Sequence, residues 1–262
     1  GVAFDGSAIE GFTAPEEADM LAFPDPSTFQ VLPWRPSHDG VARVFCDIRK
    51  PDRTYFEGDP RECLRRMFRK AESSGYIMNV GTELEYYYFP DDHTPVPMDE
   101  VGYFDLMPSD SARDLRRDTV LTLEKMSIPV EYTFHSSGKS QHGISLRHAE
   151  ALTTSDAIMT AKYIIKLEAY ASDIHASFMP KPMAGEPGSG MHVHQSLYDL
   201  DGNNAFYDPD DPQGYRLSKV AKRYLAGLLK YAPEFCAITN QHVNSYKRLI
   251  AGGEAPIYLS WA

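Results

Sequence analysis

The chain has few of the features that mark secreted, membrane or nucleic-acid-binding proteins. It has only three cysteines, Cys46, Cys63 and Cys236, too few and too widely spaced for a disulfide framework or a zinc knuckle. No apolar run reaches the length of a membrane span, and no targeting segment is recognisable. Lys and Arg number 26 against 37 Asp and Glu, which gives a net charge of −11 and no basic stripe. We therefore expect a cytoplasmic protein that binds neither nucleic acid nor membrane.

What is present is the composition of a globular protein. The chain has 262 residues, of which 42% are hydrophobic, enough for one large domain or for one domain with a smaller one beside it. Residues 1–40 are rich in turn signals but keep aromatic residues throughout, so we expect ordered extended pieces rather than a linker. Both ends read as the middle of strands, and we expect the chain to be incomplete at both.

Helices and strands alternate without strict βαβ order, which favours an α+β fold. Asp59 followed by Pro60 predicts a helix start, and Gly75 its end. Further helices are predicted over 111–126, 155–171 and 217–228, the last from apolar residues at i, i+3, i+4 and i+7. Predicted strands cover 41–46, 83–89, 130–134, 176–179 and 191–198.

Two acids stand on the predicted strand at 83–89. Glu83 and Glu85 occupy positions i and i+2, so both side chains point to one face. Two like charges side by side repel each other unless a cation lies between them, and a divalent ion with oxygen ligands would serve. The alternative is an exposed strand face with two solvated acids.

Two histidines and a serine share one face of the predicted strand at 191–198. His192, His194 and Ser196 alternate along it, after the glycines at 188 and 190. Imidazole is the commonest nitrogen ligand of metals, and glycines allow a ligand close to the backbone. The alternative is an edge strand with polar residues turned outward.

A third group stands near the C-terminal end. Arg248 has the fork geometry that clamps a carboxylate or phosphate, and Glu254 follows two glycines on a loop, where a base can approach a substrate. The alternative is a basic helix end and an ordinary turn. The sequence Gly138-Lys139-Ser140 looks like a phosphate loop, but that motif needs a glycine where Thr133 stands, so we judge the match to be chance.

Taken in order, these segments resemble those of glutamine synthetases. Asp5–Ile9 is similar to the family's FDGSSI segment, and Glu83–Glu85 to its Glu-x-Glu strand. Four further matches follow in the family's order: 178–182, 188–192, 244–249 and 254–256. The segments 103–106 and 205–209 add to the resemblance, which runs across essentially the whole chain.

The resemblance implies an ATP-dependent ligase that joins the glutamate γ-carboxylate to ammonia or an amine through a γ-glutamyl phosphate. Its metal, Mg²⁺ or Mn²⁺, would have Glu83 and His192 as ligands, and Glu85 would bind a second ion. The implied ATP contacts are Glu131, His194, Gln195 and Ser196. The implied glutamate-binding residues are Gly188 and Arg248, with Glu254 as the base and Asp5 reaching into a neighbouring subunit.

The resemblance also implies an architecture. Residues 1–55 would form part of a β-grasp domain, and residues 56–262 a catalytic domain with an antiparallel curved sheet and packed helices, whose C-terminal part is missing. Sites in the family form between subunits, so a homo-oligomer is implied, a dodecamer of two stacked hexameric rings.

The chain departs from the family pattern around the second ion. Two glutamates that bind this ion in the family are replaced by Ser136 and Gly143, and only Glu85 remains of the set. Pro187 and Gly253 are further departures. Two other hypotheses follow: a catalytically impaired paralogue that acts as a nucleotide-binding regulator or scaffold, and, more remotely, a metal-dependent hydrolase built on the same acids and histidines.

Overall fold

The computed structural model describes residues 1–35, 38–103, 105, 110, 112–252 and 254–261. The chain divides into two compact units, Gly1–Met78 and Asn79–Ala262. Gly253 and two residues of the 103–106 segment lie outside the described residues.

The first unit holds a small antiparallel sheet in the order β1-β2-β5, formed by Val2–Asp5, Asp19–Pro24 and Cys46–Arg49. Two short strands, β3 (Gln30–Val31) and β4 (Ala42–Arg43), pair separately. The single strand predicted at 41–46 is therefore wrong in its bounds: the chain leaves β4 after Arg43 and enters another sheet at Cys46. Single turns of 3₁₀ helix cover Gly6–Ala8, Pro15–Glu17 and Pro26–Thr28.

The helix α1 (Pro60–Ser73) begins as predicted. The Asp59 carboxylate accepts a hydrogen bond from the Arg61 amide, and Pro60 occupies the first turn, where a missing N–H costs nothing. Arg61 and Arg65 of this helix both pair with Asp25 and Asp47 of the sheet. These four largely buried side chains join the helix to the sheet within this unit.

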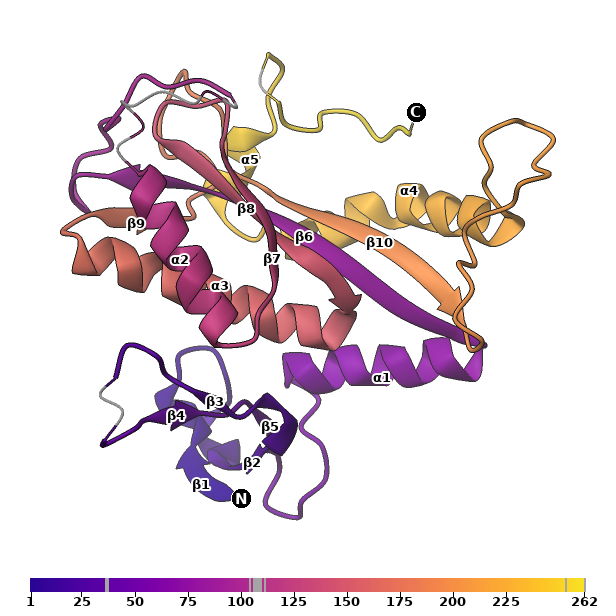
Figure 1. Ribbon diagram of the computed structural model, residues 1–262. Helices are drawn as coiled ribbons and strands as arrows, with labels where there is room; N and C mark the ends of the chain where they lie inside the picture. The colour runs from indigo at the N-terminus through magenta and orange to yellow at the C-terminus, as the bar shows by residue number, and fades with distance from the viewer. Residues whose placement is uncertain (36–37, 104, 106–109, 111, 253, 262) are drawn as a thin grey trace. The chain divides into compact units, whose positions relative to one another are not determined.

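The second unit is built on a five-stranded antiparallel sheet in the order β10-β6-β8-β7, with β9 also paired to β6 (Figure 1). The long strand β6 (Tyr76–Phe89) lies between β10 (Met191–Asp199) and β8 (Gln141–Glu150). β7 (Val130–His135) and β9 (His175–Ser177) complete the sheet. The predicted strands at 83–89, 130–134, 176–179 and 191–198 are confirmed as elements, with shifted ends.

Helices α2 (Arg113–Lys125) and α3 (Ala151–Ala171) lie side by side on one face of this sheet (Figure 1). α4 (Lys219–Thr239) and the short α5 (Val243–Arg248) follow β10 along the chain. The predicted helices at 111–126, 155–171 and 217–228 thus exist, although α4 continues for 11 residues past the predicted end. Pro233 lies inside this helix, although proline usually kinks or breaks a helix interior.

The strand β8 was not predicted, and it is central to the sheet. Its sequence combines histidines, a glycine and charged residues, and Ile144 is its single β-branched residue, which is little of the content that marks a strand. Its first six residues are nevertheless buried, because β6 and β7 pair with β8 on its two sides. Tertiary pairing, and not local preference, makes this segment a strand.

The strand register sorts the side chains into two faces. Tyr86, Ile144 and His142 lie on the face covered by helices and are fully buried. Glu83 and Glu85 lie on the opposite face, since they alternate with Leu84 and Tyr86 along β6. This second face carries the predicted site.

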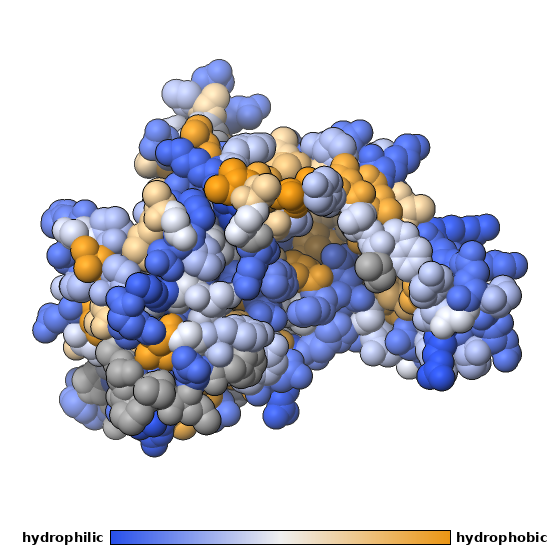
Figure 2. All heavy atoms as spheres, turned by 90° about the horizontal axis from the view of Figure 1, so that it is seen from above, coloured by the Kyte–Doolittle hydropathy of each residue, from blue (hydrophilic) through white to orange (hydrophobic). Residues whose placement is uncertain are grey.

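Among the described residues, no helix is long and apolar enough to span a membrane. Large apolar side chains do reach the surface after β10, among them Ile238, Val243 and Tyr258. The face of the molecule in Figure 2 is mainly polar, with apolar side chains gathered in patches between the charged ones.

Candidate functional site

Glu83 and two histidines converge on the open face of the sheet. The Glu83 Oε2 atom lies 3.9 Å from His192 Nδ1 and 3.8 Å from His194 Nε2, and Tyr132 Oη lies 3.5 Å away on the other side. The Glu83 side chain is only 17% exposed, whereas both histidines are more than half exposed. The two distances from Glu83 to the histidines are longer than a hydrogen bond. Glu83, His192 and His194 therefore face a common point without bonding to one another.

Glu85, two residues further along β6, is held by hydrogen bonds. Its Oε1 accepts from the Ser136 hydroxyl at 2.8 Å, and its Oε2 accepts from the Gly190 amide at 3.0 Å. The Glu85 amide donates in turn to the Gly190 carbonyl at 3.0 Å. This carboxylate is therefore fixed between β10 and the turn that follows β7.

The next residue of that turn reaches a different acid. The Ser137 hydroxyl donates to Glu254 Oε2 at 2.6 Å. Two consecutive serines thus connect the second acid of the strand pair, Glu85, with the predicted base, Glu254. The two acids, which are far apart in sequence, lie on either side of one turn.

Arg248 packs against the glycines that precede β10. A β-carbon on Gly190 would stand 2.5 Å from Arg248 Nη2, and one on Gly188 would stand 2.5 Å from Arg248 Cγ. No side chain other than hydrogen fits at either residue while the arginine keeps this place. The Arg248 Nε atom is buried and has no hydrogen-bond partner among the described residues, so the guanidinium keeps donor capacity for a ligand.

A second set of contacts fixes the position of Arg248. The side chain of Asn244 in α5 accepts from the Lys181 amide at 2.7 Å and donates to its carbonyl at 3.0 Å. Gln141 of β8 donates to the Gly188 carbonyl at 3.2 Å. These paired bonds anchor α5 and the loop 180–190 to the sheet, and with them the arginine.

The residues predicted to contact ATP are placed along β10 and β7. The Ser145 hydroxyl donates to Glu131 Oε2 at 3.4 Å, and Ser196 Oγ lies 3.2 Å from His148 Nε2. Gln195 accepts a hydrogen bond from Tyr224 of α4. Gln195 alternates with His194 and Ser196, so it lies on the opposite face and supports β10 from the helix side.

Asp5 belongs to the first unit. Its Oδ1 accepts from the Ser7 amide at 2.9 Å and from the Ser7 hydroxyl at 2.6 Å. These bonds lower the pKa of the Asp5 carboxyl, which stays ionised at neutral pH. Its role in a neighbouring subunit stays a prediction.

A buried group behind the site was missed at the sequence level. His135 Nε2 lies 3.1 Å from Asp99 Oδ1, and His135 Nδ1 lies 2.8 Å from the Ser136 carbonyl. A carbonyl and an ionised carboxylate both accept, so both ring nitrogens carry protons. Burial disfavours the charged ring, but the bonds to Asp99 and Ser136 outweigh it and raise the pKa of His135. Asp99 also accepts from the Ser140 amide at 2.9 Å, so this ion pair fixes the turn 136–140 from below.

Asp99, His135 and His142 have potential ligand atoms within 4.8 Å of one another, a spacing that is compatible with a metal-binding site. Arg116 argues against it: its Nη1 lies 2.8 Å from His142 Nδ1, and it also pairs with Asp110. An arginine beside the cluster already supplies the positive charge, and His142 accepts from it. Burial, together with the charge of Arg116, lowers the pKa of His142, which stays neutral.

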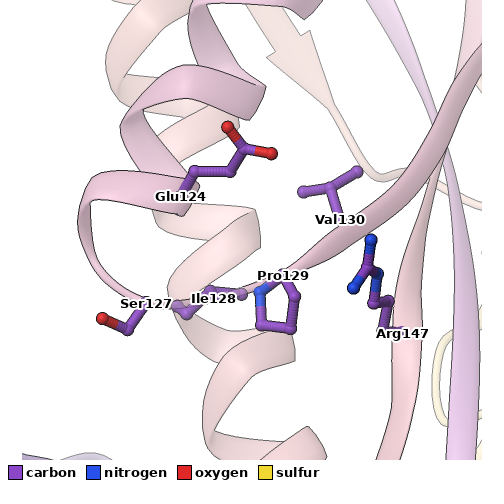
Figure 3. A pocket seen from close by; sticks show the side chains of 6 residues that line it. All are labelled: Glu124, Ser127, Ile128, Pro129, Val130 and Arg147. Atoms are coloured by element: carbon purple, nitrogen blue, oxygen red, sulfur yellow. The ribbon is translucent and has the colours of Figure 1, made fainter.

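A separate hollow lies where α2 ends and β7 begins (Figure 3). Glu124 of α2 and Arg147 of β8 flank the start of the strand there. Its lining residues are Glu124, Ser127, Ile128, Pro129, Val130 and Arg147. None of the predicted site residues is among them, and we assign this hollow no function.

The two acids differ in their fitness for a metal ion. Glu83 with His192 and His194 offers one carboxylate and two imidazoles, a suitable set for a divalent cation. Glu85 has a hydroxyl and an amide as neighbours, and both donate to it. The first position fits a metal, whereas the second offers a single carboxylate.

Two family models match the chain. The family model described as glutamine synthetase, catalytic domain, matches residues 57–262, and the one described as glutamine synthetase, beta-Grasp domain, matches residues 1–51. A glutamine synthetase of Methanosarcina mazei is 50% identical over 266 residues, and one of Thermotoga maritima is 49% identical over 266. Each alignment covers the whole chain but only 59% and 60% of the relative, so the chain spans about three fifths of their length. The predicted domain boundary at residue 55 stays a prediction.

Solved structures show the same fold. A cryoEM structure of Plasmodium falciparum glutamine synthetase superposes with a TM-score of 0.87 at 27% identity, over 96% of this chain and 55% of that one. A structure titled "Apo GmaS without ligand" gives 0.86 at 29% identity, over 96% of this chain and 59% of that one. The predicted α+β class, with a β-grasp segment ahead of a catalytic domain, is confirmed. The chain belongs to the glutamine synthetase family.

Proposed function

We propose that the chain supplies much of the active site of an ATP-dependent ligase, which joins the glutamate γ-carboxylate to ammonia or another amine. The γ-phosphoryl group of ATP passes to a γ-carboxylate oxygen, leaving ADP. The amine nitrogen then attacks the carbonyl carbon of the resulting γ-glutamyl phosphate, phosphate leaves, and the nitrogen gives up a proton. Membership of the family, with glutamine synthetases about 50% identical over the whole chain, is the main support.

The nucleotide side of the site is assigned to Glu83, His192 and His194. We infer that Glu83 and His192 hold a divalent ion, Mg²⁺ or Mn²⁺, which neutralises phosphate charge when bound. His194, Ser196 and Glu131 contact the nucleotide in this proposal, and Gln195 supports the strand. The convergence of Glu83 with two imidazoles is the single observation that best supports this assignment.

The glutamate side is assigned to Arg248 and the glycines beneath it. Arg248 lies against Gly188 with its Cγ and Cδ atoms and against Gly190 with its guanidinium, which can clamp a substrate carboxylate without a side chain in the way. Glu254, bonded to Ser137, is the group proposed to take the proton from the amine. Positioning and charge neutralisation are what phosphoryl transfer mainly requires.

We further propose a homo-oligomer, in the form of stacked hexameric rings, in which Asp5 completes the site of a neighbouring subunit. A cytoplasmic location goes with this proposal. Light scattering of the purified protein tests the assembly directly, since a dodecamer and a monomer differ twelvefold in mass.

The function is tested by ADP release from ATP with glutamate and ammonium or a panel of amines. Glu83→Gln removes one charge from the proposed metal position, so we expect kcat/KM to fall about 100-fold. Arg248→Lys loses the fork and should raise the KM for glutamate more than the KM for ATP. His93→Ala, at an exposed histidine next to Asp92, is the matched control and should leave both constants unchanged.

Two outcomes would contradict the proposal. One is a protein that binds nucleotide with metal but releases no ADP with any amine, which favours the impaired paralogue. The other is ATP-independent hydrolysis that needs Glu83 and His192, which favours the hydrolase.

A further inference from the structure

The strand register arranges the site face in two parallel rows. Each row runs from an acid on β6, across a small residue on β8, to an aromatic residue on β7. The rows are Glu83, Ser145, Tyr132 and Glu85, Gly143, Phe134. In each row the acid and the aromatic residue lie two strands apart, with only the small residue of β8 between them.

In the second row the aromatic ring fills the space above the glycine. A β-carbon on Gly143 would stand 2.1 Å from Phe134 Cζ and 2.3 Å from its Cε1. The ring is 6% exposed and has two tyrosine rings beside it: Tyr132 at 5.8 Å and Tyr103 edge-on at 6.3 Å between centroids. Tyr103 is 62% exposed, so this aromatic group is open to solvent on one side.

The space beside Glu85 is therefore a poor site for a second metal ion. Divalent Mg²⁺ takes six oxygen ligands and Ca²⁺ takes more, mostly from carboxylates, carbonyls and water. The row of Glu85 contributes a single carboxylate, because Gly143 has no side chain and Phe134 has no oxygen. The Ser136 hydroxyl points its hydrogen at Glu85 and is 2% exposed. These residues do not fit the second ion that the family resemblance implies.

The same surroundings suit an organic ammonium group. A protonated amine needs one carboxylate to pair with, and its carbon substituent gains from aromatic contact, since ring faces attract cations and apolar groups alike. Glu254 lies across the turn of Ser136 and Ser137 from Glu85, and a second carboxylate there can accept the proton that the nitrogen gives up.

We propose that Glu85, Tyr103 and Phe134 form the subsite for a primary amine with a carbon substituent, in place of a second metal ion, and that Phe134 determines this specificity. The inference rests on the proposed ligase function. The ammonium nitrogen pairs with Glu85 and the substituent lies against the tyrosine, which Phe134 supports from behind. Ammonium itself has no carbon substituent to contact Tyr103 and is the weaker substrate.

The first experiment compares ammonium, methylamine and n-butylamine at saturating ATP and glutamate. We expect kcat/KM for n-butylamine to exceed that for ammonium at least tenfold. Phe134→Leu and Tyr103→Ala should each lower this ratio about tenfold while the KM values for ATP and glutamate stay within twofold. Tyr103→Ala is the safer variant, because its side chain is exposed, and Tyr170→Ala on α3, 82% exposed, is the control.

The second experiment counts ions. Titration of the purified protein with Mn²⁺ and ADP, followed by electron paramagnetic resonance, should give one bound ion per chain. Two ions per chain, or a preference for ammonium that both substitutions leave unchanged, would overturn the inference and leave the ligase intact. If no amine supports ADP release, the ligase proposal fails, and the ion count still decides whether Glu85 binds a metal.

Discussion

The ring of Phe134 lies directly over Gly143, so close that a β-carbon at residue 143 would stand 2.1 Å from the ring. The two residues are paired across β7 and β8. Glycine is therefore required at residue 143 as long as the ring keeps its place, and the ring in turn fills a space that a longer side chain on β8 would otherwise occupy.

A double-mutant cycle tests this mutual dependence. Gly143→Ala should destabilise the protein by about 1–3 kcal/mol, because the ring must move to an unfavourable position. Phe134→Ala alone should cost about 3–5 kcal/mol through the cavity it leaves. In the Phe134→Ala background, Gly143→Ala should cost little, and urea unfolding of the four proteins measures the coupling. Additive losses would show that the ring does not press on residue 143.

The two glycines beneath Arg248 should respond differently to alanine. At Gly190 the added carbon meets only the flexible guanidinium, at 2.5 Å, so the arginine moves and the fold is kept. We expect Gly190→Ala to change stability by less than about 1 kcal/mol and to raise the KM for glutamate at least tenfold. At Gly188 it also meets the Pro180 carbonyl at 2.6 Å, which cannot yield easily. Gly188→Ala should therefore lower the melting temperature as well, and an unchanged melting temperature would contradict this reading.

The buried pair of Asp99 and His135 should give the protein a specific pH dependence. The bonds from His135 and Ser140 outweigh burial and lower the pKa of Asp99 from 3.8, so its contribution is present above pH 3.8 and is lost as the pH falls through the folded value. The pKa of His135 is raised from 6.5, so its contribution is full below pH 6.5 and is lost as the pH rises through the folded value. The pair is thus strongest between these limits.

Asp99→Asn tests this expectation through a difference in unfolding free energy. The variant should be less stable than the parent by about 3 kcal/mol near pH 5, because a buried imidazolium loses its partner. The difference should shrink toward pH 3 and toward pH 9. Burial and the charge of Arg116 lower the pKa of His142, so acid favours the unfolded state in both proteins. Asp99 raises this pKa, so its loss strengthens the effect of His142 in the variant. A difference that does not vary with pH would rule out an ionised pair.

In the first unit, the ion pairs between α1 and the sheet should matter more than their number suggests. Asp47 pairs with both Arg61 and Arg65, and all three side chains are at most 25% exposed. Asp47→Ala leaves Arg61 and Arg65 to share the carboxylate of Asp25 and should cost about 2–4 kcal/mol, measured by thermal unfolding. Glu57→Ala breaks the exposed pair with Lys50, at 2.8 Å, and should not shift the transition measurably. Equal effects of the two changes would contradict the role given to burial.

Much of the second unit could be predicted from local pattern. Aromatic content marked β6, apolar spacing marked α4, and alternation put Glu83 and Glu85 on one face. The strand β8 could not be predicted, since its histidines, glycine and charges favour a strand only when β6 and β7 pair with it. Without β8, the register of β6, β8 and β7 could not be predicted either. The placement of Phe134 and Glu85 in one row depends on that register.

By itself the sequence determined the family, the fold class and the order of the chemical groups along the chain, because short motifs and periodicities are local properties. Only the tertiary structure decided that the ring of Phe134 closes the space over Gly143, that His135 carries two protons, and that two serines connect Glu85 with Glu254. Each of these depends on distances between residues of different elements, which are fixed by strand pairing and packing and not by the spacing of residues along the chain.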